Sequence, residues 1–301
     1  MTLAALALAW IGLAILVRPP RTFLGRLEPR TQAVAALTAT LGLALIPISF
    51  SLAALYAALS ASGGVGLQAC GRLVWAILTD PIARPDLSLA LGVVAATPLA
   101  VARGVASSWR SQSASRALAQ RGHGPVLVIA TLRPVAFTVG LLRPRVVVSR
   151  GLMSRTRSEF RGVVLAHEEA HRRGRHPLLL FIGESAAKAL PLAPLRWGAD
   201  TLRFALESLA DDRAVRHTGS RELVAETVAS VALASVGGTA GFEGDEVRRV
   251  RRLLASDQPA PLRGLLVVAG LFAVLAFAGG HTAHCATEGA QILATSQCRL
   301  H

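Results

Sequence analysis

The chain has 301 residues, of which 52% are hydrophobic, and its mean hydropathy is +0.48. This composition is too apolar for an ordinary soluble domain. The formal net charge is +14, but aromatic residues make up only 5% of the chain and we find no nucleic-acid-binding motif, so direct nucleic-acid binding is not expected. The arginines lie beside apolar stretches instead, which is typical of the cytoplasmic ends of membrane helices.

Three apolar segments in the first third of the chain predict transmembrane helices, at residues 2–17, 32–59 and 86–102. Four arginines separate the first two segments, and more arginines follow the third. By the positive-inside rule, the N-terminus is expected outside the cell and the chain after residue 103 in the cytoplasm. Residues 1–103 are therefore predicted to form a membrane region.

Residues 104–261 have broken hydrophobicity and predict a soluble-type domain on the cytoplasmic side. Short β-branched runs at 126–129, 136–139 and 145–148 predict strands of a small antiparallel sheet. Helices are expected at 158–174, with Ser158 as N-cap, and at 199–217 and 222–236. The apolar segment 177–194 is interrupted by charged residues and proline, and we expect a helix that lies against the membrane or packs across the catalytic domain.

Residues 262–279 predict a fourth transmembrane helix, which runs outward because arginines precede it. The short tail at 280–301 is then extracytoplasmic. The tail contains Cys285 and Cys298, and Cys70 lies in the other predicted external loop. This placement suits disulfides that form on the oxidising side of a membrane. Cys285 with Cys298 is the favoured pair, although the sequence does not fix the connectivity.

The strongest motif is His167-Glu168-x-x-His171, inside the predicted helix at 158–174. Residues four apart project from the same face of a helix, so both imidazoles can bind one Zn²⁺. Glu168 beside them can take a proton from an attacking water. This is the H-E-x-x-H pattern of zinc metallopeptidases.

A catalytic zinc needs a third protein ligand, and Glu207 is the candidate. Asp211 lies four residues later on the same helical face, where it could accept the free N–H of a ligand histidine and fix its tautomer. The alternative is that both acids are surface residues that pair with Arg203 or Arg213.

The chemistry also needs a donor for the oxyanion and a surface that holds the substrate. The donor candidates are Arg203, Arg213 and His217, and the sequence does not choose among them. An extended substrate could pair with the backbone of the second predicted strand. That strand consists of Ala136, Phe137, Thr138 and Val139.

Several other polar residues are expected at the surface or at a helix end. His176 is expected to have a surface or helix-end role rather than a role at the metal. The arginine cluster at 248–252 is interpreted as a membrane-surface anchor, and Glu169 and Asp212 as solvent-facing acids.

The H-E-x-x-H motif followed by Glu207-x-x-Ala210-Asp211 resembles the BlaR/MecR-type membrane metallopeptidases, the antibiotic-sensor proteases of the gluzincin type. The segments 134–140 and 144–149 are similar to the strand pair that precedes the zinc helix in that family. The resemblance covers about residues 125–217 by motif and most of the chain by layout. HtpX/Ste24-type membrane proteases share these motifs.

The resemblance implies a mainly α, multi-span membrane protein. Its α+β zinc-protease domain would be inserted between the third and fourth transmembrane helices and would bind one Zn²⁺. The implied role is signalling, in which the enzyme cleaves itself or a cytosolic partner such as a penicillinase-repressor-type transcription factor. The large penicillin-binding sensor of the best-known members has no counterpart in the short tail, so β-lactam sensing is not expected. The alternatives are HtpX-like quality control of membrane proteins and a non-catalytic receptor or scaffold with a vestigial site.

Overall fold

The computed structural model describes residues 27–61, 85–120, 124–190, 192–236 and 245–255, together with residues 11, 14, 75, 79 and 80. Apart from residues 11 and 14, the predicted first span lies outside these described residues, as do the predicted fourth span and tail. The three cysteines also lie outside them. The fourth span and the Cys285–Cys298 disulfide therefore stay predictions.

Two long helices cover the predicted second and third spans. Helix α2 runs over Pro29–Ala61 and α4 over Pro85–Ser111, so α4 continues beyond the predicted boundary at residue 103. Within the described residues, the segment Leu91–Ser111 is long and apolar enough to cross a membrane. Apolar side chains on this helix face outward, with Leu99 75% exposed, as expected for lipid contact. A short helix, α5 (Ser113–Ala119), follows.

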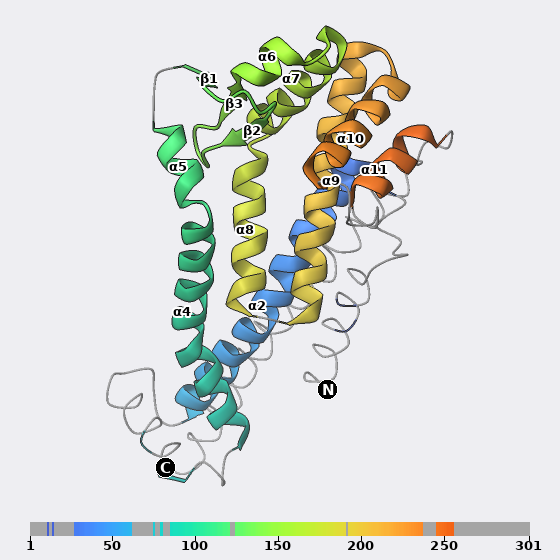
Figure 1. Cartoon of the computed structure of the whole chain (residues 1–301). Coiled ribbons are helices and arrows are strands. Elements are labelled where there is room, and N and C mark those ends of the chain that lie inside the picture. Colours follow the sequence, from blue (N-terminus) through green and yellow to red (C-terminus); the bar gives the residue numbers. More distant parts are fainter. Residues whose placement is uncertain are drawn as a thin grey trace, which may run out of the picture.

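Helices α8 (His176–Ala189) and α9 (Ala193–Thr218) form a hairpin that packs among these long helices. Helix α9 lies along α2, and α8 lies along α4 (Figure 1). The segment expected at 177–194 is therefore a helix of this bundle. The hairpin also carries α9 up to the end of the bundle where the sheet lies.

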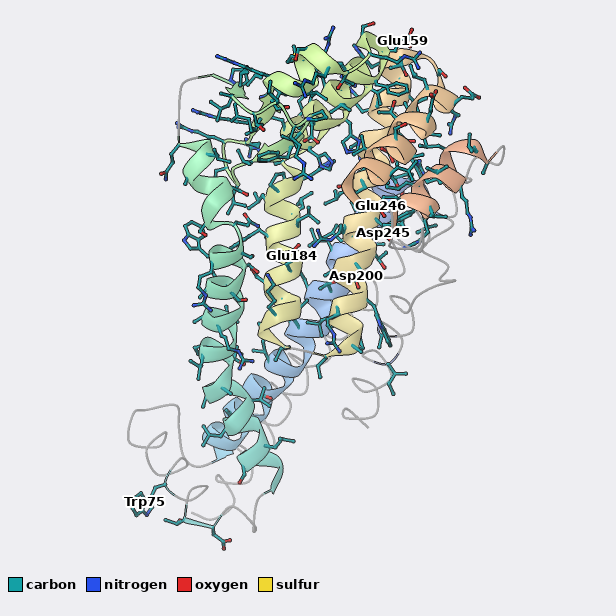
Figure 2. All side chains as sticks on the ribbon, in the orientation of Figure 1. Trp75, Glu159, Glu184, Asp200, Asp245 and Glu246 are labelled. Carbon is teal, nitrogen blue, oxygen red and sulfur yellow. The ribbon has the colours of Figure 1, made fainter. Side chains whose placement is uncertain are left out.

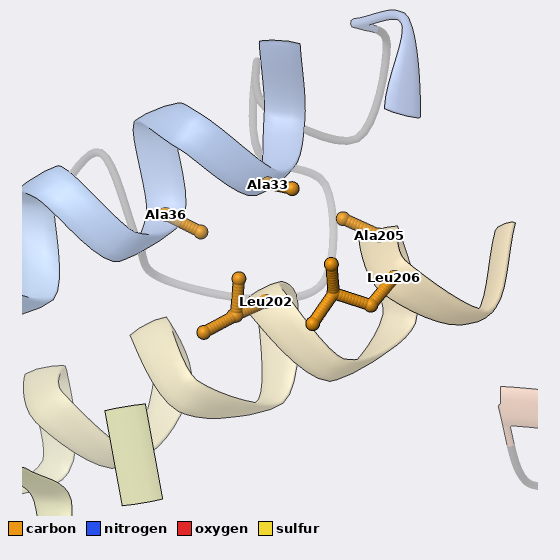
Figure 3. Close-up of a cluster of buried hydrophobic side chains, with 5 residues drawn as sticks. All are labelled: Ala33, Ala36, Leu202, Ala205 and Leu206. Atoms are coloured by element: carbon orange, nitrogen blue, oxygen red, sulfur yellow. The ribbon is translucent and has the colours of Figure 1, made fainter. Parts of the chain in front are cut away.

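Small residues allow the bundle helices to approach closely. Ala33 and Ala36 of α2 pack against Leu202, Ala205 and Leu206 of α9 in a buried cluster (Figure 3). Such contacts between small and large side chains let two helix backbones lie close together. The α2–α9 contact fixes the depth at which α9 sits in the bundle.

Helices α4 and α8 also lie in close contact, at Gly104. A Cβ placed at Gly104 would lie 2.7 Å from the backbone nitrogen of Ala189 and closer to the carbonyl oxygen of Ser185. Only glycine fits where two backbones meet in this way.

The three strands are β1 (Val126–Ile129), β2 (Ala136–Val139) and β3 (Arg145–Ser149), which confirms the three predicted strand segments. Their order is β1-β3-β2, with β3 parallel to β1 and antiparallel to β2. The prediction of an antiparallel sheet was therefore wrong for one pair. Strand β3 is the most buried and takes the centre; because β1 and β2 run in opposite directions, it must be parallel to one of them.

Helices α6 (Arg150–Arg155) and α7 (Ser158–Arg173) follow the sheet. The Ser149 hydroxyl accepts a hydrogen bond from the Leu152 backbone and caps α6. The buried face of the sheet packs on α7 through Val146 and Val148. Ser158 is the first residue of α7, and the N-cap position falls on Arg157, one residue before the prediction.

Helices α10 (Arg221–Val236) and α11 (Asp245–Leu254) cover the other side of α7 and α9. Val163 of α7, Ala214 of α9, Val224 of α10 and Leu253 of α11 share one buried cluster. Burial of this apolar surface holds α7 and α9 in a fixed relation, which positions the side chains that face each other across the two helices.

Candidate metal centre

His167 and His171 of α7 and Glu207 of α9 converge between the two helices. One ligand atom from each lies within 4.8 Å of the other two. The two Nε2 atoms are 3.0 Å apart, and the Glu207 carboxylate oxygens lie 3.4 Å from His167 Nε2 and 3.5 Å from His171 Nε2. Tetrahedral bonds of about 2.0–2.1 Å place ligand atoms about 3.3 Å apart, so this donor set fits a His₂Glu zinc site.

Glu168 points toward the sheet, on the side where β2 meets α7. The Thr138 hydroxyl lies 2.8 Å from Glu168 Oε2 and 3.0 Å from the Glu168 backbone oxygen. Thr138 belongs to β2, which is an edge strand of the sheet in the described part of the chain. The predicted base and the predicted substrate strand, residues 136–139, therefore lie next to each other.

Asp211 is fully buried behind His167. Its Oδ1 lies 3.0 Å from His167 Nδ1, which leaves Nε2 of that ring directed at the cluster. A carboxylate at this position fixes the orientation and tautomer of a ligand histidine. The sequence predicted this relationship, and the structure brings the two residues together.

Arg249 of α11 contacts both Asp211 and Glu207 at the metal centre. It donates to both Asp211 oxygens, at 2.6 and 2.8 Å, and its Nη1 lies 3.0 Å from Glu207 Oε2. Its guanidinium thus bridges Glu207 and Asp211, for which the alternative prediction was surface pairing with Arg203 or Arg213. Sequence reasoning missed Arg249, because the contact spans 38 residues and no local spacing reports it.

The interpretation of residues 248–252 as a membrane-surface anchor was wrong for two of the four arginines, Arg249 and Arg252. The Arg249 side chain is 14% exposed and lies at the metal centre, and Arg252 binds Asp212 at 2.6 Å. Arg248 lies over the Phe204 ring at 3.9 Å but is half exposed, so its role as an anchor stays a prediction. Asp212 is accordingly paired and largely covered rather than solvent-facing. Buried carboxylates need charged partners, and α11 provides them to α9.

His176 is the first residue of α8, in agreement with the predicted helix-end role, but it is buried, so the alternative of a surface role was wrong. Its Nδ1 lies 2.9 Å from the Nδ1 of His171, with the two rings edge to face. The preceding residue, Arg175, has a left-handed backbone at φ 50°, which turns the chain sharply between α7 and α8. Gly174 has no side chain that would collide with the His176 ring.

The charges at the centre support one another. Burial alone would lower the pKa of His167, but Asp211 and Glu207 raise it to about 9. Burial would raise the pKa of both carboxyls, but hydrogen bonds from His167 and His171 to Glu207, and from Arg249 and His167 to Asp211, hold them below their usual range. Burial lowers the pKa of His176 to about 4, so this ring is neutral. The centre therefore favours a positive charge between two ionised carboxylates.

The predicted oxyanion donors lie at three different places. Arg203 pairs with Glu184 on the α8–α9 hairpin, where Figure 2 labels Glu184. Arg213 lines a separate pocket, and His217 is exposed in the last turn of α9. Among the described residues, the arginine in contact with Glu207 is Arg249. The assignment of an oxyanion donor stays a prediction.

Comparison with known families agrees with the geometry. Residues 108–241 match the family model described as Peptidase family M48. No curated protein and no solved structure was found to match the chain. The matched region contains the sheet, α7 and α9, and thus His167, His171 and Glu207, while Arg249 lies beyond it. Residues 108–241 are therefore similar to the peptidases of family M48, and this region contains a His-His-Glu cluster that could hold a metal ion.

Proposed function

We propose that the chain is a membrane-bound zinc endopeptidase that hydrolyses peptide bonds on the cytoplasmic side. One observation carries this proposal. Glu168, which lies beside the candidate metal ligands, forms a hydrogen bond to Thr138 of the edge strand β2. A metal-binding cluster alone could be structural. A cluster with an adjacent carboxylate and an open strand edge has what peptide hydrolysis requires.

His167, His171 and Glu207 would hold one Zn²⁺, which supplies Lewis acidity toward a peptide carbonyl and lowers the pKa of water. Glu168 would accept a proton from the attacking water at its carboxylate and pass it to the leaving amine. The Thr138 hydroxyl holds Oε2 of that carboxylate at 2.8 Å and thereby fixes its orientation.

The substrate would lie extended along β2. This strand pairs with β3 on one side only, so the backbone groups on its other side can pair with a peptide. Backbone pairing along Ala136–Val139 would bring a peptide bond next to Glu168. An edge of this kind accepts a chain that continues in both directions, which favours an endopeptidase.

The membrane location rests on α4 and on the arginine distribution. The segment Leu91–Ser111 is apolar and carries exposed large hydrophobic side chains. Figure 1 shows the sheet and α7 at one end of the long helices. Arginines next to the apolar segments support the proposal that this end is cytoplasmic, by the positive-inside rule.

The proposed biological role is regulatory signalling, in which the enzyme cleaves a cytosolic repressor-type protein or itself. The sequence resemblance to BlaR/MecR-type proteases supports this role. HtpX-like quality control is the second candidate, because the family match is to M48 as a whole and does not specify an antibiotic-sensor protease. Discrete products from one cytosolic protein favour signalling, whereas general cleavage of misfolded membrane proteins favours quality control.

Activity is tested with purified full-length protein and a quenched fluorescent unstructured peptide. Removal of a general base costs about 10²–10⁴ in rate, so Glu168→Gln is expected to lose activity while it retains zinc. Glu159→Gln is the matched control, since Glu159 lies on the same helix and pairs with Arg157 at the surface. Unchanged cleavage by zinc-loaded Glu168→Gln would rule out the proposed mechanism, and absence of cleavage in all variants would favour the non-catalytic receptor.

A further inference from the structure

A second site lies beside the metal centre, in a pocket of about 420 Å³ formed by α2, α7, the start of α8 and α9. We call it the arginine pocket, because four arginines line it. These are Arg30, Arg173, Arg213 and Arg216. Apart from Arg213, which is one of the predicted oxyanion donors, none of them has a role in the proposed peptidase chemistry.

The charge of the arginine pocket is largely uncompensated. Arg173 pairs with Glu169, at 2.6 Å, on the surface of α7. Arg30, Arg213 and Arg216 form no ion pair within the described part of the chain, and the lining there contains no carboxylate. Guanidinium groups gathered without acids repel one another, and a bound anion that accepts their N–H groups in pairs would relieve this repulsion.

The remaining lining is apolar or neutral. Ala170 of α7, Leu209 of α9 and the buried ring of His176 also line the pocket. The site therefore combines cationic and apolar lining. This combination suits a ligand that has an anionic group and a hydrocarbon part.

The arginine pocket also has a defined place relative to the predicted membrane. Arg30 is the second residue of α2, and the predicted second span begins at residue 32. Cytoplasmic arginines precede this helix in the sequence. The pocket is thus expected at the level of the lipid headgroups on the cytoplasmic side, where basic pockets between helices bind anionic lipids.

We propose that the arginine pocket binds the phosphate headgroup of an anionic phospholipid. The guanidinium groups of α9 and α2 would hold the phosphate, and Ala170 and Leu209 would contact the glycerol and the start of the acyl chains. The site goes beyond the peptidase activity and does not require it, although it relies on the predicted membrane placement of α2. An acidic protein segment would satisfy the arginines but would leave the apolar lining, Ala170 and Leu209, without a partner.

The arginine pocket shares one residue with the surroundings of the metal centre. His176 lines the pocket and also contacts His171 through Nδ1. A bound headgroup would therefore lie one side chain away from a metal ligand.

The test is native mass spectrometry of the full-length protein released from mixed micelles that contain phosphatidylglycerol or phosphatidylcholine. Wild type is expected to retain one phosphatidylglycerol and to show no such retention of phosphatidylcholine. Arg213→Gln combined with Arg216→Gln is expected to lower phosphatidylglycerol occupancy about tenfold or more, since each charge-assisted arginine–phosphate contact is strong. Arg150→Gln is the matched control, an exposed arginine on α6 away from the pocket.

The substituted arginines are exposed, so the double variant is expected to fold, which size-exclusion chromatography checks. If it does not, Arg213→Lys with Arg216→Lys keeps the charges and is expected to bind with intermediate occupancy. Equal phosphatidylglycerol retention by the wild type and the folded glutamine or lysine variant would overturn the proposal. Displacement of the lipid by inorganic phosphate at comparable concentration would overturn the lipid assignment, as would retention of an acidic peptide in place of phosphatidylglycerol.

Discussion

The Nδ1 atoms of His171 and His176 lie 2.9 Å apart, and both rings are buried. Because the Nε2 of His171 faces the other ligand candidates, its Nδ1 is the atom that a neighbour can orient. For His167 the corresponding neighbour is the Asp211 carboxylate. The Nδ1 atoms of the two candidate ligands on α7 therefore contact different groups. His167 contacts the anionic Asp211 carboxylate, and His171 contacts the neutral His176 ring.

His176→Leu is expected to weaken zinc binding about 10–100-fold, which is the usual cost of removing the partner that orients a ligand histidine. Competition with a chelator of known affinity measures the change. His217→Leu is the matched control, since His217 is exposed at the end of α9 and should leave the affinity unaltered. Equal affinities for wild type and His176→Leu would show that His176 does not orient His171.

Arg249→Met is expected to destabilise the fold by about 3–5 kcal/mol, because it leaves the buried Asp211 carboxylate without its cation. Thermal unfolding in detergent micelles measures the loss. Arg251→Met tests the same change on the exposed side of the same helix and should shift the free energy of unfolding by less than about 0.5 kcal/mol. Similar losses of unfolding free energy for both variants would mean that the Arg249–Asp211 pair does not stabilise the fold more than an exposed arginine does.

Arg175→Gly is expected to stabilise the protein relative to Arg175→Ala by about 1 kcal/mol. Among the described non-glycine residues Arg175 has a positive φ, of 50°, and a Cβ in this region costs about 1–2 kcal/mol. The larger backbone freedom of glycine in the unfolded chain offsets part of the gain. Unfolding midpoints of the two variants decide the question, and a more stable alanine variant would contradict the left-handed turn.

Gly104→Ala is expected to destabilise the bundle by about 1–3 kcal/mol, because the added methyl group would push the α8 backbone away from α4. Gly92 lies on the same helix, and no atom lies within 4 Å of the position that an added methyl group would take there. Gly92→Ala should therefore be neutral or stabilising by up to about 1 kcal/mol. Thermal unfolding of both variants provides the comparison. If both substitutions had the same effect, the close α4–α8 contact would not be a determinant of stability.

Local spacing was sufficient to predict the parts of the centre that lie on single helices. The four-residue separations of His167 from His171 and of Glu207 from Asp211 directly imply shared helical faces, and the structure brings these faces together. The three strand segments were likewise visible as β-branched runs bounded by turns. Their order was not, because strand order depends on which strand is buried most completely in the assembled sheet.

Arg249 and His176 could not be assigned from local patterns. Arg249 reaches Asp211 across 38 residues, and its segment has the composition of a membrane-surface helix. His176 comes close to His171 through the left-handed turn at Arg175, a conformation that arginine rarely adopts. In both places the deciding contact forms only after α8 and α11 have packed against their neighbours.

The most direct test of the metal centre is the zinc content of the purified full-length protein, measured by inductively coupled plasma mass spectrometry for wild type and Glu207→Ala. The site predicts about one zinc per wild-type chain and a sharp decrease in the variant, because the α9 ligand is lost. Glu222→Ala, at an exposed acid on α10, is the matched control and should keep its zinc. Equal zinc content in wild type and Glu207→Ala, or no zinc in either, would contradict the proposed metal centre.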